Sequence, residues 1–290
     1  MDGLLNVHKP SGITSFEVVR RVRQLSGERR VGHGGTLDPL ATGVLPVALG
    51  QGTRVLEFLE RTTKTYRGAI RLGITTDTDD AEGRVLAERS PEAVSLDALE
   101  KALSRFRGRI QQAPPRYSAL KRAGIPAYKM ARAGEEVILE PRTVDVLRLD
   151  LLAFESPLAV VEVECGRGTY IRALARDLGE ALGCGAHLQA LVRRRVGPFA
   201  LEDAISLEDL AQTFREGRAG DVLEPLDCIL LHLAAAILGP EKVGAVRNGQ
   251  GVTFPTDDVQ QCRAYSTEGQ LVALLRQEGQ LWRPYKVFAS

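Results

Sequence analysis

The chain has 290 residues, 44% of them hydrophobic and 26% charged, which is typical of a globular protein with a core and excludes a wholly disordered or collagen-like chain. Its 38 Lys and Arg balance 37 Asp and Glu, so the net charge of +1 favours no class of partner. No pair of its four cysteines has the spacing of a zinc or redox motif, and the N-terminus does not resemble a secretory signal. We expect a cytoplasmic protein without a membrane segment.

Residue patterns predict strands with interspersed helices. Alternating or apolar runs predict strands over residues 3–7, 43–49, 64–72, 144–154, 159–165 and 188–196. Helical periodicity with capping signals predicts helices between Thr14 and Gly27 and over about 53–60, 96–106 and 169–182. Pro46 predicts that its strand lies at an edge or carries a bulge. The order lacks the regular alternation of a doubly wound sheet, so we expect an α+β fold with a mixed sheet.

The C-terminal part of the chain differs from the rest. After residue 228, glycines and short apolar runs recur at close intervals, which predicts a small β-barrel of about 60 residues. Residues 201–228 are expected to be a connecting helical region. We predict a catalytic or binding domain over residues 1–228 and a second domain over 229–290.

Charge is unevenly distributed along the chain. Residues 73–100 carry two basic and eight acidic side chains, whereas residues 101–134 carry nine basic side chains and no acidic one. The basic segment also contains Phe106, Tyr117 and Tyr128. Cations for phosphates together with flat rings for bases are the composition that RNA binders use, although a solvated helix face is about as good an explanation.

A glycine-rich segment over residues 31–52 contains Asp38 as its only carboxylate. Pro39 disfavours the helical conformation at Asp38, so this side chain is expected to extend from a loop. An acid in that setting either stabilises a turn or acts in catalysis, and the pattern alone favours the turn.

Several other chemistries are excluded because their motifs are absent. The chain has no P-loop, no dinucleotide-binding glycine motif, no His-Glu-x-x-His and no nucleophile-elbow serine. The acidic run 77–82 does not have the spacing of a calcium loop, so we interpret it as a solvated loop without a metal. A glycosidase would need a second carboxylate.

Residues 32–45, Gly-His-Gly-Gly-Thr-Leu-Asp-Pro-Leu-Ala-Thr-Gly-Val-Leu, resemble the signature loop of the TruB family of tRNA pseudouridine synthases. Three further blocks resemble the family in order, at residues 9–15, 64–66 and 165–188. The tail from about 229 resembles the family's PUA-type RNA-binding domain more weakly. Gly34 and His8 depart from the family pattern, in which Thr and Asp are usual.

The resemblance implies a fold, an activity and a set of residues. It implies a mixed-sheet pseudouridine synthase domain that converts uridine 55 in the tRNA T-loop to pseudouridine, by base flipping and without cofactor or metal. Its partner would be the T-loop and stem of tRNA, with no obligate protein partner. The implied catalytic residues are Asp38 as nucleophile, Tyr66 and Arg172, and the implied substrate-binding residues are His33, Tyr170, Leu191 and Lys9. Lys9 would either hold the catalytic loop or bind a phosphate.

Each of these residues also has a structural interpretation. Tyr66, Tyr170 and Leu191 fit ordinary core positions, and Lys9 and Arg172 fit surface charges. The competing functional hypothesis is a non-catalytic tRNA-binding or tRNA-folding protein on the same fold. A third possibility is a synthase directed by a guide RNA and partner proteins, although the stand-alone bacterial type is the closer resemblance.

Overall fold

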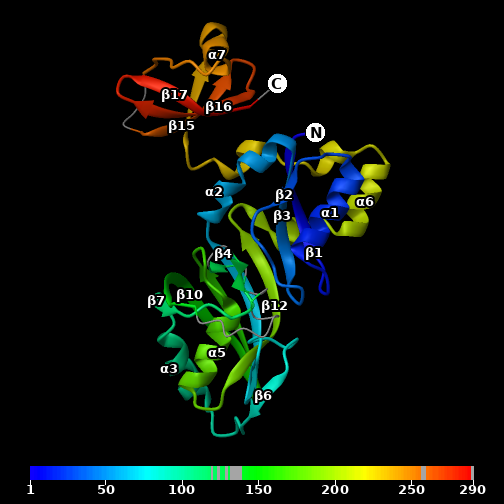
Figure 1. Ribbon diagram of the computed structural model, residues 1–290, viewed down its shortest axis with the longest axis vertical. Helices are drawn as coiled ribbons and strands as arrows, with labels where there is room; N and C mark the ends of the chain where they lie inside the picture. The colour runs from blue at the N-terminus through cyan, green and yellow to red at the C-terminus, as the bar shows by residue number, and fades with distance from the viewer. Residues whose placement is uncertain (119, 123–124, 128–129, 131–138, 256–258, 289–290) are drawn as a thin grey trace.

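The computed structural model describes residues 1–118, 120–122, 125–127, 130, 139–255 and 259–288 (Figure 1). Its main sheet has the order β1-β3-β12-β4-β11-β10-β7, with β2 and β13 pairing β3 and β12. Only the β12–β3 pair is parallel, so the sheet is mixed, as predicted. Its strands are β1 (Gly3–Lys9), β2 (Val31–His33), β3 (Thr42–Leu49), β4 (Lys64–Leu72), β7 (Gly108–Gln112), β10 (Arg142–Glu155), β11 (Leu158–Cys165), β12 (Ala186–Val196) and β13 (Phe199–Ala200).

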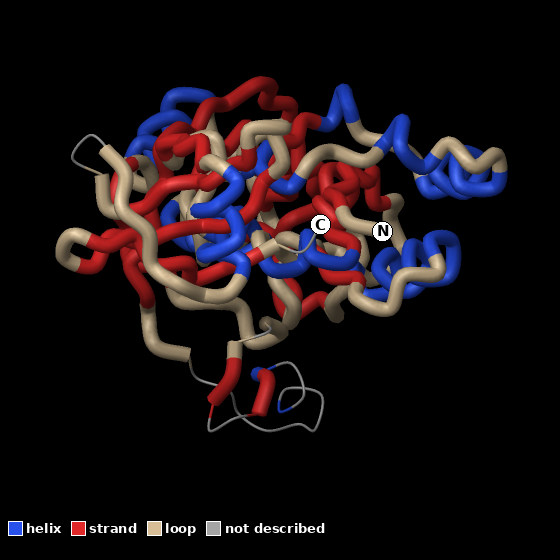
Figure 2. Tube along the Cα trace, turned by 90° about the horizontal axis from the view of Figure 1, so that it is seen from above, coloured by secondary structure: helices blue, strands red, loops and turns tan. Residues whose placement is uncertain are grey.

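Helices cover the two halves of this sheet separately. The helices α1 (Ser15–Ser26) and α6 (Leu207–Arg215) lie side by side next to β1 and β3 (Figures 1 and 2) and share an apolar core with them. The other half is covered by α3 (Leu96–Ser104) and α5 (Ile171–Ala181), which pack on β4, β10, β11 and β12. The site described below lies where these two halves meet.

The predicted elements agree with the structure in type, with some differences at their ends. Thr14 caps α1 by accepting a hydrogen bond from the Glu17 amide, and Gly27 ends the helix with φ of 67°. The helix expected over 53–60 is divided into a 3-10 helix, Gly50–Arg54, and α2 (Leu56–Glu60). The expected alternation of burial in β4 is confirmed.

The expectation that β3 is an edge or bulged strand is wrong. It lies inside the sheet, with β1 on one side and β2 and β12 on the other. Pro46 is tolerated because it lies one residue beyond the end of the β2–β3 pairing, which stops at Val47. On that side Pro46 contributes only its carbonyl, which accepts a hydrogen bond from the Gly34 amide at 2.8 Å.

A second, smaller sheet follows in the C-terminal part of the chain. It has the order β14 (Ala234–Leu238), β15 (Gln261–Ser266), β16 (Leu271–Glu278) and β17 (Leu281–Val287), with α7 (Pro240–Arg247) packed on it. It touches the main domain through α2: Lys286 Nζ lies 2.6 Å from Glu57 Oε1, and Phe58 and Leu274 share one apolar cluster.

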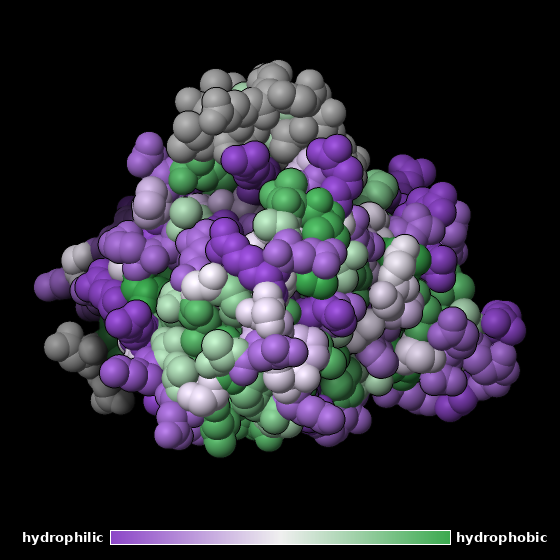
Figure 3. Space-filling view, turned by 90° about the horizontal axis from the view of Figure 1, so that it is seen from below, coloured by the Kyte–Doolittle hydropathy of each residue, from purple (hydrophilic) through white to green (hydrophobic). Residues whose placement is uncertain are grey.

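Short hairpins complete the described fold. They are β5 (Ile74–Thr76) with β6 (Val85–Glu88), and β8 (Lys121–Arg122) with β9 (Ile125–Pro126). The end of the main domain farthest from the C-terminal sheet shows polar side chains interspersed with small apolar patches (Figure 3). Within the described ranges, none of the helices has the length and hydrophobicity needed to cross a bilayer.

Candidate active site

Asp38 lies on the loop between β2 and β3, and side chains from two other elements, α1 and β1, fix the backbone around it. The Ser15 hydroxyl accepts from the Leu37 amide at 2.8 Å and donates to the Leu37 carbonyl at 3.1 Å. On the other side of Asp38, Lys9 Nζ donates to the Pro39 carbonyl at 3.2 Å. The loop is therefore held in one conformation before any substrate arrives.

Two glycines of this segment lie in close packing with neighbouring groups. Gly43 has φ of +105°, and a Cβ there would lie 2.3 Å from the Arg193 carbonyl oxygen of the neighbouring strand. A Cβ at Gly34 would lie 2.6 Å from a methyl group of Leu59. The threonine usual at this position in the TruB family would therefore require the Leu59 side chain to shift in this chain. The other departure, His8, is an exposed residue of β1.

Lys9 is completely buried, so it is not an ordinary surface lysine. Its ammonium donates to the carbonyls of Pro10 at 2.8 Å, Ile13 at 2.7 Å and Pro39. Burial lowers the pKa of Lys9 to about 8, although the nearby Asp38 charge opposes that change. Lys9 is thus placed to hold the loop that carries Asp38.

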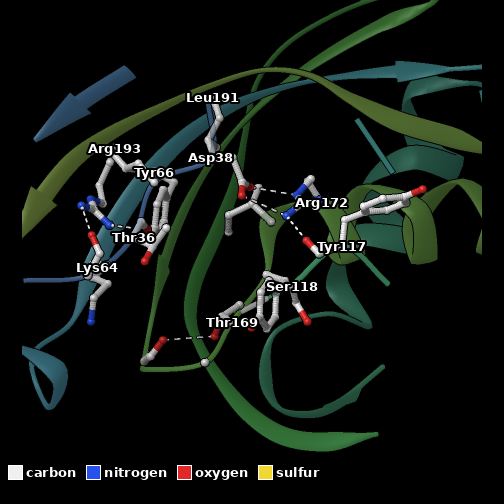
Figure 4. Close-up of a pocket in the computed structure, with 16 residues that line it drawn as sticks. Thr36, Asp38, Lys64, Tyr66, Tyr117, Ser118, Thr169, Arg172, Leu191 and Arg193 are labelled. Atoms are coloured by element: carbon white, nitrogen blue, oxygen red, sulfur yellow. Dashed lines mark hydrogen bonds and ion pairs between the residues drawn. The ribbon is translucent and has the colours of Figure 1, made fainter. Parts of the chain in front are cut away.

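Arg172 is paired with Asp38, as expected from the sequence. Its Nη2 donates to Oδ1 of Asp38 at 3.0 Å, and its Nε lies 2.8 Å from Oδ2 (Figure 4). The guanidinium also donates to the carbonyls of Thr78 at 3.1 Å and Tyr117 at 3.0 Å. Only 5% of the arginine side chain is exposed, against 33% for the aspartate. The carboxylate therefore faces open space while its cation is fixed behind it.

The acidic run 77–82 is a loop whose end is exposed as expected, but the expectation of a solvated side chain is wrong for Asp80. Asp80 is buried and its Oδ2 lies 3.5 Å from Arg172 Nη1, so Arg172 lies between two carboxylates. Thr78 and the Glu82 amide hold Asp80 at 2.6 Å and 3.1 Å. The sequence offers no signal for this contact, because the two groups are 92 residues apart in the chain.

A cavity of about 270 Å³ opens in front of Asp38 (Figure 4). Tyr66 and Leu191 form its buried wall, from the adjacent strands β4 and β12. Tyr170, which precedes α5, lines it as well. Its volume is just below the roughly 300 Å³ of the smallest pockets for drug-sized ligands, which suits a single planar ring. Burial raises the pKa of Tyr66, and the neighbouring Arg193 charge opposes this.

Arg193 is a site residue that the sequence reasoning missed. It is opposite Tyr66 in the β12–β4 register and is only 1% exposed. Its guanidinium donates to the carbonyls of Val44 at 2.8 Å, Thr36 at 3.3 Å and Gly35 at 3.0 Å. A signal existed, because period-two alternation from Leu191 places Arg193 on the same face of the strand.

Tyr170 is held by a second residue that was not anticipated, Gln112 at the end of β7. The buried Gln112 amide accepts from the Tyr170 backbone N–H at 2.8 Å and donates to its carbonyl at 3.1 Å. Because α5 lacks a side-chain cap at Tyr170, this pair fixes the start of the helix that carries Arg172.

His33 lies outside the ring-sized cavity. It lines a neighbouring cavity of about 500 Å³ that shares Asp38 and Arg172 with the first and is bordered by the exposed Phe16. Burial lowers the pKa of His33, and Arg193 adds to this effect, so its neutral form is favoured. The structure thus brings Asp38, Arg172 and the expected pocket residues together and puts His33 on the far side of the carboxylate.

Comparison with known proteins identifies the family. Residues 23–171 match the TruB family pseudouridylate synthase (N terminal domain), and residues 172–237 match the tRNA pseudouridylate synthase B C-terminal domain. The chain belongs to the TruB family. A tRNA pseudouridine synthase B of Dehalococcoides mccartyi (strain BAV1) is 43% identical over 290 residues, covering 99% of this chain and 97% of the relative. One of Pseudomonas aeruginosa (strain UCBPP-PA14) is 48% identical, covering 88% of this chain and 84% of the relative.

Solved structures of the same fold agree with this assignment. The crystal structure of a Cbf5-Nop10-Gar1 complex matches with a TM-score of 0.76 and 29% identity, covering 99% of this chain and 85% of that one. The structure of an H/ACA RNP bound to a substrate RNA containing 2′-deoxyuridine matches with a TM-score of 0.74 and 26% identity, covering 99% and 85%. This TruB-family chain is an isomerase that acts on tRNA and forms pseudouridine.

Proposed function

We propose that this enzyme isomerises uridine 55 in the T-loop of tRNA, with Asp38 as the nucleophile. One observation carries the proposal: a carboxylate on a fixed loop, paired with a buried guanidinium, faces a cavity the size of one ring. In the reaction the N1–C1′ bond breaks, uracil rotates within the pocket and a C5–C1′ bond forms. The C5 proton leaves to water, and N1 takes up a proton in its place. A carboxylate can act as nucleophile toward the ribose or the base.

The surrounding residues have distinct roles in this proposal. Arg172 orients the Asp38 carboxylate, and Tyr66 and Leu191 contact the flipped base from the closed end of the cavity. Tyr170 supplies the outer wall. Lys9 acts on the catalytic loop and not on the RNA.

His33 serves the RNA around the target and not the target base. It lines the cavity on the other side of Asp38, next to the exposed Phe16 ring. We propose that these two rings contact the rearranged T-loop. A neutral imidazole suits that role because it stacks and hydrogen-bonds without needing a counter-charge.

Base flipping must be offset by contacts with the rest of the tRNA. Flipping costs a few kcal/mol, roughly, and stacking on a protein ring returns about 1–3 kcal/mol per base. We propose that basic side chains of the 101–134 segment and the C-terminal domain bind phosphates. Of that segment, Tyr128, Lys129 and Arg132 lie outside the described residues.

The remaining features of the proposal concern organisation. We place the boundary between a catalytic domain and a PUA-type domain at residues 228 and 229, which is supported by the two sheets ending at Ala200 and starting at Ala234. We propose that the enzyme works in the cytoplasm without a cofactor or an obligate protein partner, since isomerisation needs no co-reactant. A protein that only binds or folds tRNA has no need for the paired Asp38 and Arg172 facing a base-sized cavity.

The position of the modified nucleotide tests this proposal. Unmodified tRNA transcript is incubated with the enzyme, and pseudouridine is located by carbodiimide adduct formation and primer extension. A single new stop at uridine 55, absent with a transcript carrying cytidine there, is the expected result. A stop elsewhere, with none at position 55, contradicts the assignment.

A further inference from the structure

A second cavity, of about 590 Å³, adjoins the ring-sized one. The two share Gly35, Lys64, Gly168 and Tyr170 as walls. The two cavities are therefore continuous enough for neighbouring nucleotides of one RNA strand to occupy them together. A volume of this size accommodates a whole nucleotide.

The second cavity is lined by three cations. Lys64, Arg142 and Arg167 face it, and Glu60 is the one carboxylate among its described lining residues. Within the described part of the chain, none of the three cations has a carboxylate within 4 Å, whereas Arg148, on the same strand as Arg142, pairs with Asp150 and Glu162.

The burial of Lys64 adds to this charge imbalance. Its ammonium donates to two backbone carbonyls, that of Thr62 at 3.3 Å and that of Leu59 at 3.5 Å. Burial and the Arg193 charge lower the pKa of Lys64, and the smaller opposing effects of Cys165 and Glu60 do not cancel this. A bound anion would supply the missing charge.

The cavity also has an apolar side and an open backbone edge. The apolar side is formed by Leu120, Val144 and Tyr170. Gln112 holds the backbone of Tyr170. The turn before α5 presents Arg167, and its Gly168 has φ of +79° with open space where a Cβ would point. An RNA backbone can approach that turn closely. Cations on one side and a ring on the other are the two surfaces that a nucleotide needs.

We propose that this second cavity binds the nucleotide next to the target uridine, with Arg142 and Arg167 neutralising its phosphate and Tyr170 contacting its base. The ligand class is thus a single-stranded RNA nucleotide with its phosphodiester. This inference rests on the proposed function, because the target base must occupy the first cavity. It assigns a binding role to two arginines that the sequence analysis did not single out.

The test measures tRNA binding as a function of salt. Asp38→Asn protein, which holds substrate without turnover in this account, is compared with the same protein carrying Arg142→Gln or Arg167→Gln. Both arginines are exposed, so the fold is expected to survive, and melting curves check this. The binding constant K falls as salt rises, and each substitution should make this negative slope of log K against log salt concentration shallower by about 0.7–0.9. That is the value of one lost phosphate contact. The matched control is Arg71→Gln, at the opposite end of the strand that begins with Lys64.

A chemical counterpart localises the contact. A T-arm RNA carries a neutral methylphosphonate on one side or the other of the target uridine. One of these should weaken binding to the Asp38→Asn protein, and that loss should disappear in the protein that also carries both glutamine substitutions.

The outcomes separate this inference from the proposed function. Any of three results would overturn the cavity assignment. The salt slope could change equally in Arg71→Gln, or stay unchanged in both arginine variants. The methylphosphonate could also still weaken binding when both arginines are replaced. Failure of wild-type protein to form pseudouridine in the same RNA would instead overturn the proposed function, and the binding slopes would still decide which residues hold the phosphate.

Discussion

Replacing Arg193 by methionine should both destabilise the protein and slow catalysis. The guanidinium donates to three carbonyls, and two of them, Gly35 and Thr36, belong to the loop that carries Asp38. Methionine has a similar length but no donor, so these buried acceptors lose their partners. An unsatisfied buried acceptor costs about 1–3 kcal/mol, so three at the lower value give about 3 kcal/mol.

That loss is large enough to measure by thermal melting. At roughly 2–4 °C per kcal/mol for a chain of this size, the melting temperature should fall by at least about 6 °C. The single-turnover rate should fall as well, because the segment before Asp38 is no longer held, and a displacement of 1 Å can cost about a hundredfold. Arg195→Met is the matched control, because Arg195 is exposed on the same strand. A melting temperature within 2 °C of wild type, or an equal loss in Arg195→Met, would refute the reasoning.

Three further results are expected. Gln112→Ala should lower the single-turnover rate about tenfold or more, because Tyr170 is no longer held, while tRNA affinity stays within a few-fold of wild type. The control Gln111→Ala loses only an exposed side-chain hydrogen bond and should keep the wild-type rate. Equal rates in the two variants would remove Gln112 from the positioning role. The pKa of Lys9 in the folded protein, about 8, is below the ordinary 10.5, so the unfolded chain binds more protons between these pH values. The free energy of unfolding of wild type, measured with urea relative to Lys9→Met, should therefore rise with pH across that window. A difference between the two proteins that does not change with pH contradicts the assignment. Gly43→Ala should unfold at lower urea concentration than wild type, since its Cβ would overlap a backbone oxygen; unchanged stability would show that the strands can separate there.

Much of the fold could be predicted because its elements carry local signals. The capping residues Thr14 and Gly27 and the alternation in β4 depend on neighbours in sequence, and the structure confirms them. Pro46 misled the prediction for the opposite reason. Whether a strand can accept a proline depends on where the neighbouring ladder ends, and that is a property of the assembled sheet.

The candidate site shows the same division between local and long-range information. Asp38 was singled out because glycines and a proline surround it, and Arg172 because its block resembles the family. Asp80 and Gln112 were missed, because their roles depend on contacts with Arg172 and Tyr170 that only folding creates. Lys9 was found, but whether it holds the loop or binds a phosphate stayed open, since a sequence does not show that a lysine is completely buried.

The most direct test of the account is the release of tritium from tRNA labelled at C5 of uridine. Isomerisation at that carbon must release the label to water, and Asp38→Asn keeps the size of the side chain while removing its nucleophilic charge. The account predicts release by wild-type protein and none above background by Asp38→Asn, although the variant still binds the tRNA. Equal release by the two proteins would contradict the claim that Asp38 performs the chemistry.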